Sequence, residues 1–259
     1  MLFRSDKAAL TKVLTYHVVP GKVMAKDVKA GKVKTVQGQE ITLATAGGVT
    51  VDIQVTDDAS FQAATGATEA QMADLRAFLV LLTEWNEKMN LVGPSALAEF
   101  WPRHAWDSAQ LLLREPEALT WADLGAGAGF PGLILAILLK GRPGAQVHLV
   151  ESMAKRCRFL SEAVKTLDLP ATVHNRRAEE LKLKVDVVTA RAIAPMTRLL
   201  GYAQPFLKQG AKGVFLKGQD VEAELTEAAK SWKFKADLAP SLSSSAGRIV
   251  EIKGPVRAA

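Results

Sequence analysis

The chain has 259 residues, of which 48% are hydrophobic and 23% charged, proportions typical of a soluble globular protein rather than a disordered one. Its longest apolar runs, such as residues 133–139, are too short to span a bilayer, and residues 1–10 lack the charged-then-apolar pattern of a signal peptide. A single cysteine excludes a disulfide framework and a cysteine metal cluster. A cytoplasmic enzyme fits these features, and we also expect a monomer with no membrane partner and no metal.

The net charge of +6 hints at an anionic partner such as a nucleic acid. Residues 1–55 contain eight Lys/Arg and four Asp/Glu, a net +4, which leaves +2 for the remaining 204 residues. A nucleic-acid interface must therefore be a local basic patch rather than a general excess of charge.

Residues 1–56 are predicted to form a β-rich segment. Apolar and polar residues alternate over 49–55, and a similar strand begins at Ile41. His17 is expected to be structural, because no acidic or histidine partner lies at metal-ligand spacing. The stretch LTKVLTYHVVPGKV at 10–23, followed by VQGQEITLATAGGVTVD, resembles part of a fasciclin domain. We assign no function to this segment.

A second domain is expected over residues 57–259. It opens with a polar stretch at 57–67 that reads as a linker. A helix from Thr68 follows, and a second helical stretch runs through 101–113. The first of these helices carries an apolar stripe, interpreted as core: Met72, Leu75, Leu79, Leu82, Trp85 and Met89.

Strands and helices then alternate, which predicts a doubly wound α/β sheet of the Rossmann-like kind. The strand-like runs are 121–124, 147–150, 186–189 and 213–216. The helical stretches are 131–140, 153–167, 195–207 and 221–231. A late strand over 248–253 is expected to be antiparallel.

The stretch WADLGAGAGFPG at 121–132 joins the first of these strands to a helix, where a doubly wound sheet binds its ligand. Two templates match it. Residues 127–132 form the G-x-G-x-x-G of dinucleotide-binding proteins, and Gly125, Gly127 and Gly129 after Asp123 form the pattern of S-adenosylmethionine (SAM) methyltransferases. Charge favours SAM, because Asp123 would repel a pyrophosphate and attract the cationic groups of SAM.

Further strand ends complete the predicted site. Glu151 ends the second strand, where a carboxylate accepts hydrogen bonds from ribose hydroxyls of either ligand class. Residues 175–180 lie between the runs 147–150 and 186–189, at the end of a further strand, and are expected along an adenine edge. Residues 189–192 lie at the end of the run 186–189 and are expected beside the transferred group.

The order of the motifs carries a family resemblance. WNEKMNLVGPSALAEFWPRHAWDSAQLL, ADLGAGAGFPGL, VHLVESMAKRCRFLSEA, NRRAEEL, DVVTARAIAP and VFLKGQ occur in that order. Over about residues 57–253 the chain resembles the bacterial 16S rRNA (guanine-N7) methyltransferases, the RsmG or GidB family. The resemblance implies a class I SAM-dependent methyltransferase fold, a guanosine of the 530 loop of 16S rRNA as substrate, in free rRNA or the small subunit, and SAM contacts from Gly125, Phe130, Ala178, Glu179 and Arg191.

The expected mechanism is positioning, with no residue acting as acid or base. Guanine N7 has a free lone pair and needs no general base, and the chain has no Asn-Pro-Pro-Tyr motif for an exocyclic amine. Arg191 is the nearest catalytic candidate, as a residue that orders the SAM pocket. His104 and Asp107, three apart on a helix in the RH-x-x-DS motif, can pair with each other. The RNA-binding candidates are Arg103, Lys155, Arg156, Arg158 and Lys217, with Arg176 and Arg177 near strand ends.

Two other functions stay open at this point. An NAD(P)-dependent oxidoreductase would use the same glycine loop, although neither tyrosine, Tyr16 nor Tyr202, lies in a Tyr-Lys motif. A non-enzymatic adhesion module would use the fasciclin-like segment.

Overall fold

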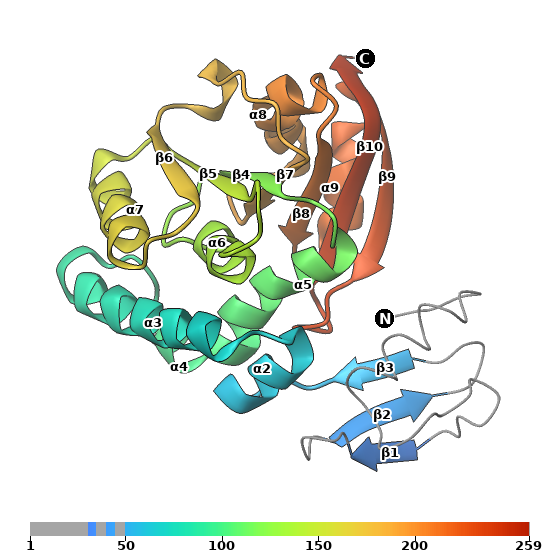
Figure 1. The fold of residues 1–259 in the computed structure, drawn as a ribbon. Helices are drawn as coiled ribbons and strands as arrows, with labels where there is room; N and C mark the ends of the chain where they lie inside the picture. The colour runs from blue at the N-terminus through green and yellow to red at the C-terminus, as the bar shows by residue number, and fades with distance from the viewer. Residues whose placement is uncertain (1–30, 35–39, 45–49, 259) are drawn as a thin grey trace. The chain divides into compact units, whose positions relative to one another are not determined.

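The computed structural model describes residues 31–34, 40–44 and 50–258 (Figure 1). The chain divides into two compact units, Met1–Thr68 and Glu69–Ala259, each treated by itself. The motif around His17 lies outside the described residues. The boundary between residues 56 and 57, deduced from composition, stays a prediction.

The first unit contains a three-stranded antiparallel sheet in the order β1-β2-β3. Its strands are β1 (Gly31–Lys34), β2 (Glu40–Ala44) and β3 (Thr50–Ile53). The two strands predicted at residues 41 and 49–55 correspond to β2 and β3, so the β-rich character is confirmed for the described part of this segment.

The stretch predicted to be a linker is instead a helix, α2 (Asp58–Thr65). Asp57 caps it: its carboxylate accepts from Ser60 N at 2.8 Å, and Ser60 Oγ accepts from Asp57 N at 3.0 Å. Gly66 ends the helix in the left-handed region with φ of 69°. This reciprocal capping and the buried ring of Phe61 outweigh the polar composition that indicated a linker.

The second unit begins with four helical segments. They are α3 (Glu69–Met89), α4 (Pro94–Ala98), a π-helix η2 (Phe100–Ala105) and α5 (Trp106–Arg114). Met72, Leu75 and Leu82 of the predicted stripe are buried in α3. Phe78 is buried as well, and it takes the core position expected for Leu79.

A seven-stranded sheet follows, in the order β6-β5-β4-β7-β8-β10-β9. The strands are β4 (Thr120–Leu124), β5 (Gln146–Glu151), β6 (Ala171–Asn175), β7 (Val187–Arg191), β8 (Lys212–Lys217), β9 (Trp232–Pro240) and β10 (Arg248–Ala258). Strands β4 to β8 are parallel, whereas β10 is antiparallel to both β8 and β9. The predicted doubly wound sheet and its late antiparallel strand are confirmed. Edge strand β9 was not predicted, because most of its residues are exposed and its sequence shows no clear apolar alternation.

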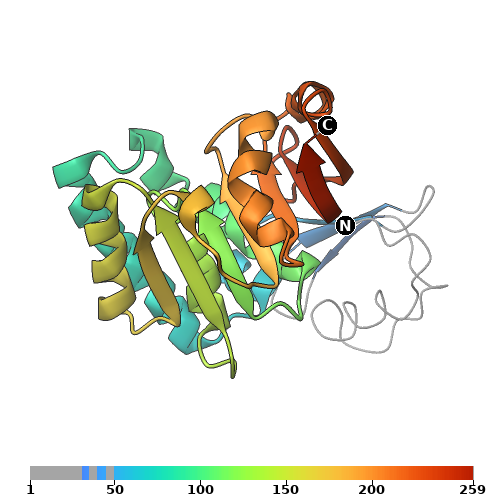
Figure 2. The same ribbon diagram turned by 90° about the horizontal axis from the view of Figure 1, so that it is seen from above.

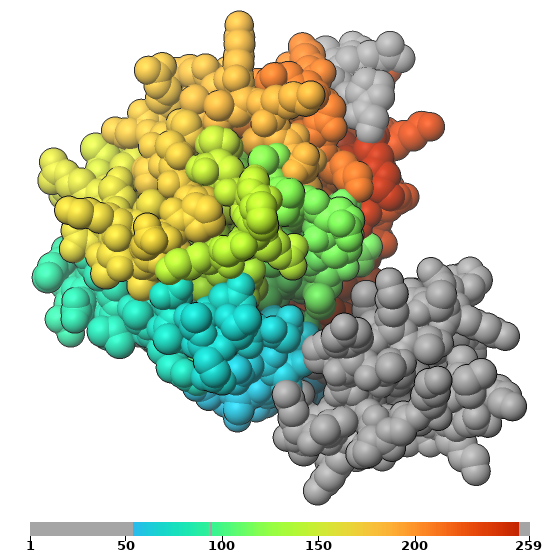
Figure 3. All heavy atoms as spheres, viewed as in Figure 1, coloured from blue at the N-terminus to red at the C-terminus, as the bar shows by residue number. Residues whose placement is uncertain are grey.

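Helices cover both faces of this sheet (Figures 1 and 2). The connecting helices are α6 (Gly132–Leu139), α7 (Ala154–Thr166), α8 (Met196–Leu207) and α9 (Val221–Ala228), with a short 3-10 helix η3 at Ala178–Glu180. All eight residues of α6 are buried, because α3, α5 and α7 all pack against it. Figure 3 shows one face of this unit, with atoms of α3, α5 and α7 at the surface. No helix among the described residues is both long and apolar enough to cross a membrane.

The topology places the predicted ligand-binding residues at one edge. Strand β4 is central, with β5 on one side and β7 on the other, so the chain reverses its direction of winding there. Parallel strands end at the same edge, which brings together the loop after β4, Glu151 at the end of β5, Asn175 at the end of β6 and Arg191 at the end of β7.

Candidate functional site

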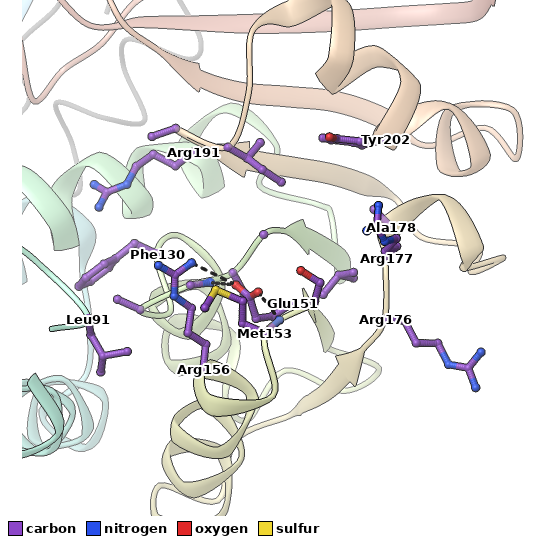
Figure 4. Close-up of a pocket in the computed structure, with 18 of the residues that line it drawn as sticks. Leu91, Phe130, Glu151, Met153, Arg156, Arg176, Arg177, Ala178, Arg191 and Tyr202 are labelled. Carbon is purple, nitrogen blue, oxygen red and sulfur yellow. Dashed lines mark hydrogen bonds and ion pairs between the residues drawn. The ribbon is translucent and has the colours of Figure 1, made fainter. Parts of the chain in front are cut away.

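A cavity of about 550 Å³ lies at this carboxyl edge of the sheet (Figure 4). Its volume is in the range of small-molecule sites. It is lined by most of the residues expected to contact a cofactor: Gly125, Gly127, Phe130, Glu151, Ala178, Glu179 and Arg191. Figure 4 shows Glu151, Met153 and Arg156 on one side of the cavity and Arg191 and Tyr202 on the other.

Several lining residues were not anticipated from the sequence. Leu91 and Val92 come from the loop after α3, Met153 precedes α7, Ile193 follows β7 and Tyr202 lies on α8. Met153 could have been anticipated from the sequence, because it lies two residues after Glu151, the predicted ribose-binding carboxylate. The loop at 91–92 and Tyr202 had none, because tertiary packing alone brings their segments to the cavity.

The glycine loop approaches its neighbours closely. Gly125 has a φ of +68°, and a Cβ built on it would lie 2.5 Å from Ile193 Cδ1 of the loop after β7. Gly125 N and Ala126 N both donate to Val150 O, at 2.8 and 3.0 Å. Only glycine combines that backbone conformation with so short an approach. The loop therefore bridges the ends of β5 and β7.

Asp123 does not line the cavity, unlike the other acidic candidates. It is fully buried, and its Oδ2 accepts from Gly132 N, the first residue of α6, at 2.8 Å. Burial raises the pKa of Asp123 to about 7. The carboxylate thus caps the helix that follows the glycine loop, whereas the sequence argument placed it against the ligand. Gly129 also lies outside the cavity lining; its φ is +88°.

Glu151 is buried at the base of the cavity and binds the loop directly. Its Oε2 accepts from Gly127 N at 3.1 Å, its Oε1 accepts from Met153 N at 2.8 Å, and Arg156 Nη1 lies 3.8 Å from Oε2. Each carboxylate oxygen retains acceptor capacity for a ribose hydroxyl.

These two carboxylates bear on the choice of ligand. A dinucleotide places its pyrophosphate on free amides of the glycine loop and of the following helix. Here Glu151 accepts the amide of Gly127 and Asp123 accepts that of Gly132. A pyrophosphate would have to compete with Glu151 for the Gly127 amide and would be repelled by that carboxylate, while the Gly132 amide is already taken by Asp123. The geometry therefore favours a ligand without phosphate and disfavours the oxidoreductase alternative.

Arg191 is the centre of a cluster on the facing wall. Its Nη2 lies 2.7 Å from His104 Nδ1, its Nη1 lies 3.4 Å from Asp107 Oδ2, and its guanidinium carbon is 5.0 Å from the Phe130 ring centroid. The His104 ring stacks on Phe130 with centroids 4.9 Å apart. His104 and Asp107 thus both face Arg191, and no bond between the two was found among the described residues.

The π-helix η2 supplies His104 to this cluster, and π-helical turns are frequent at functional sites. Burial, together with the charges of Arg191 and Arg103, lowers the pKa of His104 to about 4. The imidazole is therefore neutral near pH 7. Because a guanidinium only donates, Nδ1 is the acceptor and the proton is assigned to Nε2.

The basic candidates divide into three groups. Arg156, Arg176 and Arg177 line the cavity, and Arg103, Lys155 and Arg158 are exposed. Lys217 is different: its Nζ lies 2.5 Å from Glu224 Oε2, donates to Ala194 O at 3.0 Å, and the side chain is 8% exposed. Its role as an RNA contact stays a prediction, and the sequence did not show that an acidic partner and a carbonyl enclose the side chain.

Cys157 is not among the residues that line the cavity. Cys157 is buried, its Sγ lies 3.2 Å from Glu151 O, and burial raises the pKa of the thiol. Among the residues whose side chains are described, no group of three or more His, Cys, Asp or Glu is arranged to hold a metal ion.

The comparisons with known proteins agree with this geometry. The family model described as GidB, rRNA small subunit methyltransferase G, matches residues 71–251, and the Fasciclin domain model matches residues 1–71, which confirms the resemblance of the N-terminal part. The protein named Ribosomal RNA small subunit methyltransferase G from Caulobacter vibrioides (strain NA1000 / CB15N) is 65% identical over 199 residues, which is 77% of this chain and 92% of the relative. The protein of the same name from Bradyrhizobium sp. (strain ORS 278) is 48% identical over 200 residues, covering 76% of this chain and 90% of the relative.

Likeness to solved structures is weaker. The crystal structure of a putative O-methyltransferase from Klebsiella pneumoniae superposes with a TM-score of 0.48 at 13% identity, covering 68% of this chain and 90% of that one. The family match spans the glycine loop, Glu151, Arg191 and the whole π-helix, and the sheet order agrees with a class I SAM-dependent methyltransferase fold. The chain therefore belongs to the GidB family, the rRNA small subunit methyltransferases G.

Proposed function

We propose that this chain transfers the methyl group of SAM to N7 of a guanosine in the 530 loop of 16S rRNA, in free rRNA or in the small ribosomal subunit. The main support is that Glu151 accepts the amide of Gly127 in the glycine loop and Asp123 accepts that of Gly132 in the following helix. This arrangement suits a cofactor without phosphate. The printed names of the relatives supply the rRNA substrate class.

The residues present fit SAM. Glu151 would accept ribose hydroxyls, and Ala178 and Glu179 would lie along the adenine, since they follow the adjacent strand. Gly125, Gly127 and Phe130 would hold the amino-acid end, with Arg191 over the Phe130 ring. Their support is their place in the cavity lining and in the matched motifs. Asp123 and Gly129 would act by shaping the loop from outside the cavity.

Catalysis would then rest on positioning. When bound, SAM supplies an electrophilic methyl group on a sulfonium. Guanine N7 is an acceptor with an available lone pair, so the chain need not remove a proton from it. The neutral His104 and the guanidinium of Arg191 would act by fixing the Phe130 ring and the cavity wall. A correctly held near-attack geometry can lower a barrier by about 7–11 kcal/mol.

RNA would be held by basic side chains around the cavity. Arg156, Arg176 and Arg177 line it, and Lys155 and Arg158 are exposed on α7 next to Arg156. Arg103 is exposed on η2, one residue before His104. Such contacts act through phosphate neutralisation and require no general excess of charge. We propose that the enzyme acts as a monomer in the cytoplasm.

The test is the 7-methylguanosine content of the 530 loop. A bacterial strain that lacks its own enzyme for this position would carry the full chain on a plasmid, beside an Arg191→Ala variant expressed to the same level. Methylation with the full chain and little with the variant would support the proposal. A well-expressed soluble chain that leaves the loop unmethylated would contradict the proposed substrate.

A further inference from the structure

Leu242, in the turn between β9 and β10, hydrogen-bonds to α5 through both of its backbone groups. Leu242 N donates to Gln110 Oε1 at 2.8 Å, and Leu242 O accepts from Trp106 Nε1 at 3.1 Å. Trp106 and Gln110 are both fully buried. Both backbone groups of one turn residue are thus satisfied by buried side chains of one helix, which fixes the turn against it.

The same turn holds the carboxylate of Asp107. Ser243 Oγ donates to Asp107 Oδ1 at 2.7 Å, and Gln110 Nε2 donates to the same oxygen at 3.0 Å. Gln110 Nε2 also lies 3.0 Å from Ser241 Oγ, which is 2.9 Å from Ser243 Oγ. Ser241 Oγ is a third and more distant donor to Oδ1, at 3.4 Å, so the Ser243 hydroxyl makes the shortest of three hydrogen bonds that restrict rotation of the carboxylate.

That restriction determines where the other oxygen lies. Asp107 Oδ2 is the atom that faces Arg191 Nη1, at 3.4 Å, and the two side chains are 17% and 20% exposed. Charge-assisted hydrogen bonds in such a partly desolvated setting are stronger than neutral ones. Arg191 Nη1 thus faces a carboxylate whose other oxygen is held by a hydroxyl of the last hairpin of the sheet.

We propose that Ser243, acting through Asp107, is a positioning residue for SAM binding: it holds Oδ2 toward Arg191 and so keeps the guanidinium in place on the cavity wall. Ser243 does not line the cavity. The inference rests on the proposed function, in which Arg191 contacts SAM.

The experiment measures SAM affinity by titration calorimetry on the full chain, with urea unfolding of each variant beside it. Ser243→Ala should weaken SAM binding about three- to tenfold, the loss of one hydrogen bond to a charged group. Ser243→Thr keeps the hydroxyl and should retain most of the affinity. Ser245→Ala, an exposed serine of the same turn, is the matched control and should bind as the unsubstituted chain does.

A double-mutant cycle with Asp107→Asn separates positioning from general loosening of the turn. If Ser243 acts through Asp107, adding Ser243→Ala to Asp107→Asn should change SAM affinity by less than about twofold. The same loss in both backgrounds would overturn the proposal, as would a Ser243→Ala chain that binds SAM like the Ser245→Ala control. A lower urea midpoint for Ser243→Ala with unchanged SAM affinity would also overturn it.

The proposed function fails in a distinguishable way. If the unsubstituted chain does not bind SAM, the cofactor assignment is wrong. If the chain binds SAM and Arg191→Ala binds it equally well, the role of Arg191 is wrong, and a loss on Ser243→Ala would then have to arise by a route other than the one proposed.

Discussion

Arg191 Nη2 and His104 Nδ1 lie 2.7 Å apart, although the two residues are separated by 87 positions in the chain. Burial and two neighbouring arginines lower the pKa of His104 to about 4, so the acceptor nitrogen stays unprotonated at physiological pH. One end of the RH-x-x-DS motif is thereby joined to the end of β7, and the stacked Phe130 ring connects both to the glycine loop.

Arg191→Lys should weaken SAM binding about tenfold or more with little loss of stability. A lysine ammonium is a point charge, so it cannot contact His104 and Asp107 in one plane while covering Phe130. Calorimetric titration with SAM, compared with the urea midpoint, measures both effects. Unchanged affinity would contradict the placement of Arg191 in the cofactor site.

Asp123 predicts a pH dependence of stability. Its pKa in the folded chain is raised by burial to about 7, above the usual value of 3.8, so the folded state favours the protonated form. That contribution is fully present below the unfolded pKa and is lost as pH rises through about 7. Relative to Asp123→Asn, the unsubstituted chain should lose up to about 1.4 kcal/mol of unfolding free energy per pH unit between about pH 5 and pH 7.

Urea unfolding of the two chains at several pH values checks this. The difference between them should level off above about pH 8, where the carboxyl is ionised in both states. Parallel stability curves across the whole range would show that Asp123 titrates normally in the folded chain.

Gly125→Ala should destabilise the fold more than Gly141→Ala. Both glycines have positive φ, +68° and +87°, but a Cβ at Gly125 meets Ile193 at 2.5 Å whereas a Cβ at Gly141 meets nothing within 4 Å. We expect about 1–2 kcal/mol for Gly141→Ala from backbone strain alone, and about 2–5 kcal/mol for Gly125→Ala, where crowding is added. Equal losses of unfolding free energy for the two variants, measured by urea unfolding, would mean that Ile193 and the loop after β7 move away from the new Cβ at no energetic cost.

Lys155 and Lys217 should behave in opposite ways when changed to glutamine. Lys155 is exposed, so Lys155→Gln should lower the slope of log affinity against log salt for a 530-loop RNA by about one. Lys217 is enclosed by Glu224 and Ala194 O, so Lys217→Gln should leave that slope unchanged and cost about 1–3 kcal/mol of stability. Filter binding between about 50 and 200 mM salt gives the slopes. A reduced slope for Lys217→Gln would show that Lys217 contacts the RNA.

Local patterns in the sequence were sufficient for β4, β5, β7, β8 and β10, for the helices between them and for the glycine loop, whereas β9 was not predicted and no bounds were given for β6. The alternation from residue 121 onward, the spacing of Gly125, Gly127 and Gly129, and Glu151 at a strand end are all short-range signals, and the parallel sheet follows from them by general topology. The motif order then indicated the family, which the comparisons show.

Tertiary structure decided which charged side chains are free to contact a ligand. Asp123 and Lys217 both looked like ligand contacts, yet one caps α6 and the other is paired within the fold, because partners distant in sequence enclose them. The polar composition of residues 57–67 did not predict α2, because the capping of this helix depends on side-chain geometry rather than on hydrophobic periodicity.

The bond between Ser243 and Asp107 joins residues 136 positions apart, and no local pattern encodes such a contact. Sequence by itself determined the backbone plan and the class of cofactor, since these depend on period and spacing. Only the folded chain decided how Arg191 is held, because that depends on which side chains meet when β7, α5 and the β9–β10 turn converge.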